Sequence, residues 1–96
     1  MLVAKADGVV VGVGVLDRCS RDVDRIVRMS VATDARRRGV GSLMLDEILR
    51  IAWAAGFRRI ELETTATWTD AVAFYAGKGF VPTKLRDGDQ HFAIEI

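Results

Sequence analysis

The chain has 96 residues, of which 50% are apolar and 28% charged, a balance typical of a soluble globular domain rather than of a disordered or fibrous chain. Its 14 basic and 13 acidic residues leave a net charge of +1, which favours neither nucleic acid nor an anionic membrane as a partner. One cysteine excludes an internal disulfide and a cysteine-based zinc finger, and with a single histidine we expect no metal site. We expect residues 1–96 to form one domain.

The N-terminal third predicts three strands. The first is Leu2–Ala6, and the Asp7-Gly8 pair that follows is a hairpin turn signal. Residues 9–16 (VVVGVGVL) are apolar and mostly β-branched, which predicts a strand buried on both faces. Residues 17–24 are polar and predict a loop, and residues 25–32 predict the third strand.

The remainder predicts two helices and three strands. The clearest helix has apolar residues at three- and four-residue spacings, namely Leu43, Leu45, Ile48, Leu49 and Ala52, and Gly56 is its expected end. Residues 59–64 predict a strand. A second helix is expected from a cap at Thr69 or Asp70 to about Lys78. Residues 80–85 and 90–96 predict two strands joined by a turn.

The order of these elements is β-β-β-α-β-α-β-β. Residues 25–64 form a β-α-β unit, whose crossover should be right-handed and whose two strands should be parallel. The other connections are short enough for antiparallel pairing. The sequence therefore predicts an α/β or α+β architecture, a mixed sheet with helices packed on it.

A basic, glycine-rich run, Arg36 to Gly41, separates the third strand from the first helix. The first N–H groups of a helix lack partners and the helix dipole adds positive potential, so this run predicts a phosphate or pyrophosphate site. It lacks the Gly-Lys-Ser/Thr of a Walker loop and the third glycine of the dinucleotide fingerprint. The alternative is a solvated surface turn.

Two motifs resemble the GCN5-related N-acetyltransferases. R-x-x-G-x-G at residues 36–41 resembles the loop with which that family holds the pyrophosphate of acetyl-CoA, and residues 71–80 (AVAFYAGKGF) resemble its A-x-x-F-Y-x-x-x-G-F. The resemblance is close over residues 25–82. It implies an acyl-CoA N-acyltransferase-like fold and transfer of an acetyl group from acetyl-CoA to a primary amine of a small molecule or peptide, without a metal.

The resemblance also implies roles for particular residues. The strand residues implied to lie along the pantetheine arm are Met29, Ser30 and Val31. Those implied to hold the pyrophosphate are Arg36, Arg37, Arg38, Gly39, Val40, Gly41 and Ser42. Tyr75 stands where members place the acid that protonates the thiolate, and Glu63 where some place the general base. Glu61 and Glu63 share one face of a strand, and the alternative for both is a solvated surface.

Two departures from the family remain. Trp68 replaces an Asn that contacts the cofactor, although Trp68 and Trp53 are expected mainly to pack. The usual first strand and two helices are missing, so we expect exposed apolar surface and a homodimer. The alternatives are a non-catalytic CoA-binding or interaction module, and a chain whose missing elements come from elsewhere. The first eight residues do not resemble a signal peptide, and a cytoplasmic location is expected.

Overall fold

The computed structural model describes residues 1–32 and 39–96. These ranges form six strands and two helices in the predicted order. The strands are β1 (Leu2–Ala6), β2 (Val9–Arg18), β3 (Val23–Val31), β4 (Arg59–Thr65), β5 (Val81–Arg86) and β6 (Asp89–Glu95). The helices are α2 (Val40–Ala54) and α3 (Thr69–Gly77). The predicted mixed sheet with packed helices is confirmed.

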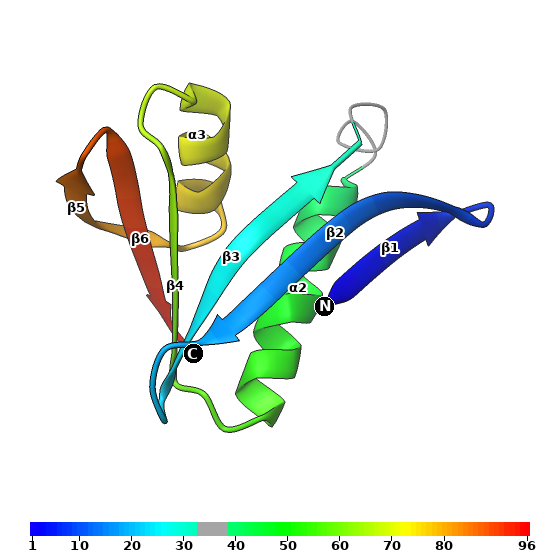
Figure 1. The fold of residues 1–96 in the computed structure, drawn as a ribbon, viewed down its shortest axis with the longest axis horizontal. Coiled ribbons are helices and arrows are strands. Elements are labelled where there is room, and N and C mark those ends of the chain that lie inside the picture. The colour runs from blue at the N-terminus through cyan, green and yellow to red at the C-terminus, as the bar shows by residue number, and fades with distance from the viewer. Residues whose placement is uncertain (33–38) are drawn as a thin grey trace.

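All six strands belong to one sheet, in the order β1-β2-β3-β4-β6-β5 (Figure 1). The two tight hairpins follow from local sequence. Asp7 and Gly8, like Asp87 and Gly88, both have positive φ, as a turn of type I′ requires. β3 and β4 are parallel because α2 connects them, and every other pairing is antiparallel.

β3 and β4 separate along their length. They pair from Val23 with Arg59 to Ile26 with Leu62, and no further. The next residue of β3, Val27, is an extra residue in the pairing with β2, since Val15 pairs with Arg28 and Leu16 with Ile26. Such a bulge bends and twists a strand. Beyond it β3 diverges from β4, which Figure 1 shows as a widening V between the two strands.

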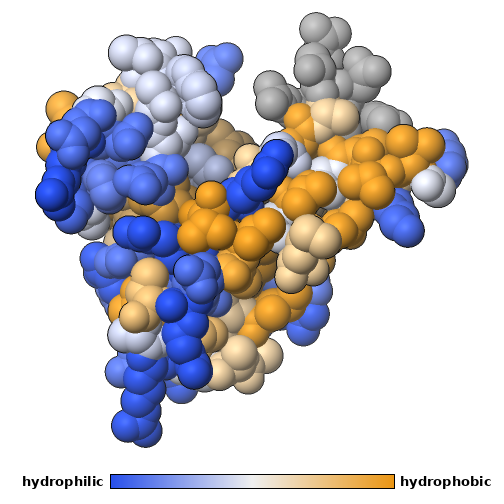
Figure 2. All heavy atoms as spheres, in the orientation of Figure 1, coloured by the Kyte–Doolittle hydropathy of each residue, from blue (hydrophilic) through white to orange (hydrophobic). Residues whose placement is uncertain are grey.

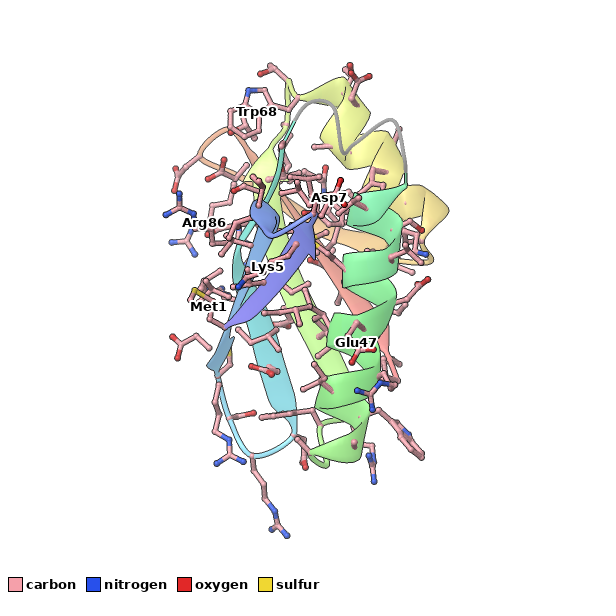
Figure 3. All side chains as sticks on the ribbon, turned by 90° about the vertical axis from the view of Figure 1, so that its right-hand side faces the viewer. Met1, Lys5, Asp7, Glu47, Trp68 and Arg86 are labelled. Carbon is pink, nitrogen blue, oxygen red and sulfur yellow. The ribbon has the colours of Figure 1, made fainter. Side chains whose placement is uncertain are left out.

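Both helices lie on one side of the sheet, as the edge-on view shows (Figure 3). α2 packs closely on β2 because two buried glycines of that strand, Gly12 and Gly14, face it. A methyl group on Gly12 would collide with Met44, and one on Gly14 would lie 2.9 Å from Ile48 Cδ1. The core forms between this helix and the sheet, with Leu45, Ile48, Ile60 and Phe92 almost fully buried.

Within the described residues no helix covers the opposite face of the sheet, which corrects one expectation. Residues 9–16 are not buried on both faces: Val9 is 63% exposed and Val10 51%. The run is uniformly apolar in sequence, but its glycines face α2, and Val13 and Val15, which alternate with them, are only half-buried. Figure 2 shows the resulting apolar surface over β1 and β2.

The ends of the helices also differ from expectation. The N-cap of α3 is Trp68, without a side-chain hydrogen bond, so neither Thr69 nor Asp70 is its cap. α2 already begins at Val40, within the glycine run. It ends at Ala54, and Gly56, at φ 96°, turns the chain toward β4.

Candidate functional site

A pocket of about 570 Å³ lies where β3 and β4 have separated, on the side of the sheet that carries the helices. β3 contributes Met29 and Val31 to its wall, and β4 contributes Thr64 from its end. The beginning of α2 contributes Gly39, Gly41 and Ser42, and α3 with its N-cap contributes Trp68, Asp70, Ala71, Phe74 and Tyr75. The pocket therefore combines the beginning of α2 and one side of α3 with the part of β3 that lies beyond its pairing with β4.

The N-terminus of α2 forms one end of this pocket. Gly39 is its N-cap, in the left-handed conformation at φ 75°, and among the described residues no side chain caps the helix. The first N–H groups of α2 therefore keep hydrogen-bonding capacity for a ligand, and the helix dipole favours an anion there. The predicted contribution of Arg36, Arg37 and Arg38 lies outside the described residues.

The start of α2 is held against both β3 and α3. A methyl group on Gly41 would lie 3.6 Å from the Phe74 ring and 3.7 Å from Val31, so a side chain here would enter the contact between three elements. Across the pocket wall, Lys78 Nζ donates to Ser42 Oγ at 2.8 Å and pairs with Asp46 at 2.6 Å. This link fixes the end of α3 to the first turns of α2.

Tyr75 lies on the α3 wall of the pocket among three aromatic rings. Its ring centroid is 5.2 Å from that of Phe74, 5.9 Å from that of Phe80 and 6.2 Å from that of Phe92. Burial raises the pKa of the Tyr75 hydroxyl above its ordinary value. The hydroxyl therefore stays protonated at neutral pH and can donate a hydrogen bond, but it is a weaker acid than an exposed tyrosine.

Glu63 does not lie in this pocket. Ile60 and Leu62 of β4 are buried toward the helices, and Glu63 alternates with them onto the open face of the sheet. There its carboxylate is 3.1 Å from Nε2 of His91, the residue opposite it on β6. The structure thus brings Glu63 together with a histidine and places it on the other face of the sheet from Tyr75.

Of the other predicted residues, some line the pocket and some do not. Met29, Val31, Gly39, Gly41 and Ser42 line the pocket together with Tyr75, whereas Ser30 and Val40 are not among its lining residues. Thr64 and Phe74 were not predicted as site residues. The motif at residues 71–80 contains Phe74 and could have indicated it, but no sequence signal marks Thr64.

The two tryptophans do not pack as expected. Trp53 is 61% exposed on α2, and Trp68 is 63% exposed. Trp68 lies where α3 begins, at one end of the molecule (Figure 3), and its indole forms part of the pocket rim. An aromatic surface therefore stands at the position where the family has an amide.

Within residues 1–32 and 39–96, no three His, Cys, Asp or Glu side chains are grouped so that they could hold a metal ion. Neither helix in these ranges is long and apolar enough to cross a bilayer.

Known proteins are similar to this chain in sequence and in fold. The family model for the acetyltransferase (GNAT) family matches residues 1–80. Mouse (Mus musculus) N-acetyltransferase family 8 member 3 is 34% identical over 59 residues, which are 62% of this chain and 26% of that protein. The matched segment is thus about a quarter of the length of this curated relative.

Solved structures agree over almost the whole chain. Ard1 from Thermoplasma volcanium is 28% identical, with a TM-score of 0.91 over 98% of this chain and 68% of that one. PaiA N-acetyltransferase from Thermoplasma acidophilum, solved in complex with coenzyme A, has a TM-score of 0.92 over 98% of this chain and 58% of that one. At 18% identity it supports the shared fold alone. On its sequence match and its fold, the chain belongs to the GNAT family of acetyltransferases.

Proposed function

We propose that the chain transfers the acetyl group of acetyl-CoA to a primary amine of a small molecule or peptide. The observation that carries this proposal is the pocket itself. It joins the N-terminus of α2, which no described side chain caps and which suits a pyrophosphate, to the part of β3 that lies beyond its pairing with β4. A strand edge presents backbone N–H and C=O groups, to which the amides of a pantetheine arm can bind.

The proposed reaction needs no covalent enzyme intermediate. The neutral amine attacks the thioester carbonyl, a C–N bond forms and the C–S bond breaks. The amine loses one proton and the departing thiolate gains one. Tyr75 lies on the pocket wall and is held in its protonated state by burial, so its hydroxyl donates toward the leaving sulfur.

Glu63 takes the amine proton in this proposal, from the other face of the sheet. β3 and β4 do not pair beyond Leu62, so no ladder of backbone hydrogen bonds joins the two strands there. The gap between them can therefore connect the two faces of the sheet. The acceptor would therefore approach from the open face, while acetyl-CoA occupies the helix side. Glu63 is 44% exposed, which leaves its carboxylate accessible.

A binding assay tests the first step. Acetyl-CoA at 100 times its dissociation constant should stabilise the fold by about 2.7 kcal/mol. For a domain of this size that raises Tm by roughly 10–20 °C. Gly39→Asp should abolish the shift, because it puts a carboxylate where a phosphate would bind.

Gly56→Asp is the matched control for this substitution. Both glycines have positive φ, and neither has an atom within 4 Å of the added Cβ, but Gly56 follows the other end of α2. It should keep the full shift. No shift of the unchanged protein with millimolar acetyl-CoA would contradict the proposal.

One observation favours a second candidate, a CoA-binding module without turnover. The predicted base, Glu63, lies outside the pocket and already has a partner in His91. A screen for acetylation across amines and peptides separates the two functions. Tight binding of acetyl-CoA with no accepted amine would favour the binding module.

A further inference from the structure

A second cavity, of about 210 Å³, lies on the open face of the sheet, against β3, β4, β5 and β6. The charged side chains in its wall are Arg25, Arg59, Glu61, Lys84 and His91. At this size it holds one chemical group rather than a whole ligand. Its position beside Glu63 makes it part of the side from which the acceptor would approach.

Each carboxylate around this cavity lies beside a basic side chain. Arg59 reaches Glu61 at 3.0 Å through Nε and Glu95 at 2.6 Å through a terminal nitrogen. Glu63 is 3.1 Å from His91. Two further cations of the wall take no part in these pairs.

Those two cations are Arg25 and Lys84. Within residues 1–32 and 39–96, neither side chain forms an ion pair. The Nε atom of Arg25 is moreover buried and has no hydrogen-bond partner in the described part of the chain. Buried donors in proteins almost always have a partner, so this one can serve an acceptor such as a water molecule or a bound carboxylate.

The pairing register places the cavity next to Glu63. Arg25 is opposite Glu61 on β4, and Lys84 is opposite His91, which is itself opposite Glu63. Glu61 and Glu63 are two residues apart, or about 7 Å along the strand. One small molecule can therefore span from the cavity to Glu63.

We propose that this cavity binds a carboxylate of the acceptor, so that the accepted amines carry an acidic group a few bonds from the amine. The guanidinium of Arg25 suits a carboxylate, which it can bind through two parallel hydrogen bonds, and Lys84 adds a second positive charge. This inference rests on the proposed acetyl transfer for its meaning, but the binding itself can be measured alone.

The test compares 4-aminobutyrate with 4-aminobutyramide, which differ only in the charge of the acid end. Backbone amide shifts of the labelled protein are followed by NMR at constant ionic strength. The carboxylate should shift the resonances of Arg25, Glu61 and Lys84, and the amide should not. Arg25→Gln and Lys84→Gln should each weaken binding of the carboxylate by about 10–100-fold, the range expected for a charge-assisted hydrogen bond.

Lys5→Gln is the matched control. Lys5 is also an exposed cation of the sheet, but it lies on β1 at the far edge (Figure 3), and its loss should leave binding unchanged. Equal response to both probes, or no response to the carboxylate, would overturn the inference. Retained binding in both Arg25→Gln and Lys84→Gln would do so too.

Acetylation of the same probes separates this inference from the proposed function. If both hold, kcat/KM should favour the carboxylate over the amide, and Arg25→Gln should raise KM for the carboxylate alone. Equal turnover of both probes, without a response to Arg25→Gln, would refute the carboxylate site and leave the transferase intact. A carboxylate that binds at Arg25 while no amine is ever acetylated would support the site and contradict the transferase.

Discussion

The close contact between α2 and β2 depends on glycine, and Gly14→Ala tests it. The added methyl group would lie 2.9 Å from Ile48 Cδ1, closer than nonbonded carbons approach one another. Ile48 is only 1% exposed, so its side chain has no solvent-filled space into which it could turn. The helix must therefore move away from the sheet, or Ile48 must take a strained rotamer.

The expected cost combines two opposing effects. Overpacking of a core typically costs about 1–3 kcal/mol. Alanine also restricts the unfolded chain, which returns roughly 0.4–1 kcal/mol. We expect Gly14→Ala to lower the free energy of unfolding by about 1–2 kcal/mol. In a domain of this size this corresponds to a Tm decrease of about 4–16 °C.

Urea denaturation followed by far-UV circular dichroism measures this free energy. Tryptophan fluorescence is less suitable, because Trp53 and Trp68 are both exposed in the folded state. Gly77→Ala is the control, since a methyl group there meets no atom within 4 Å. Gly77 is the last residue of α3, so this change should stabilise the protein by up to about 1 kcal/mol.

A double-mutant cycle identifies the contact itself. Ile48→Val removes Cδ1, the atom in collision, and by itself should cost about 0.5–1.5 kcal/mol. In the Gly14→Ala background it should cost less, with a favourable coupling of at least about 0.5 kcal/mol. Wild-type stability of Gly14→Ala, or strict additivity in the double variant, would refute the reasoning.

Four further predictions follow from the site and the open face. Tyr75→Phe should lower turnover by about 10²-fold and leave acetyl-CoA affinity unchanged. This is the lower end of the range for acid catalysis, because the raised pKa makes Tyr75 a weaker acid. Equal rates in the two proteins would show that Tyr75 only packs. Because the pKa of Tyr75 is raised on folding, the unfolded chain loses this proton first. The contribution of Tyr75 to the free energy of unfolding should therefore be fully present below about pH 10 and be lost as pH rises further. In Tyr75→Phe this decline should be smaller, as alkaline urea titrations can measure. Glu63→Gln should depress turnover most at low pH, where the acceptor amine is largely protonated, and a pH-independent loss would contradict its role as a base. Light scattering at micromolar concentration should find a homodimer, because β1 is an edge strand and an apolar face lies over β1 and β2; a monomer would refute this.

Local sequence was sufficient for the elements and their order. Asp7-Gly8 and Asp87-Gly88 specify their turns because few other residues tolerate two successive positive φ angles. The apolar spacing within residues 43–52 specifies a helix, since only a period near 3.6 places those side chains on one face. The two motifs indicated the family, and with it the parts of the chain that form the pocket.

Tertiary structure decided which residues meet. Whether the apolar residues 9–16 are covered on one face or two depends on where the helices pack, which no local pattern records. The bulge at Val27 separates β3 from β4 and opens the pocket, but it arises from a register set by the neighbouring strand. Glu63 acquires His91 as a partner through the pairing of β4 with β6, across 28 residues of chain. Side-chain alternation predicted which residues share a strand face, but the order of strands in the sheet determines what lies opposite them, because pairing across the sheet depends on the packing of the whole chain.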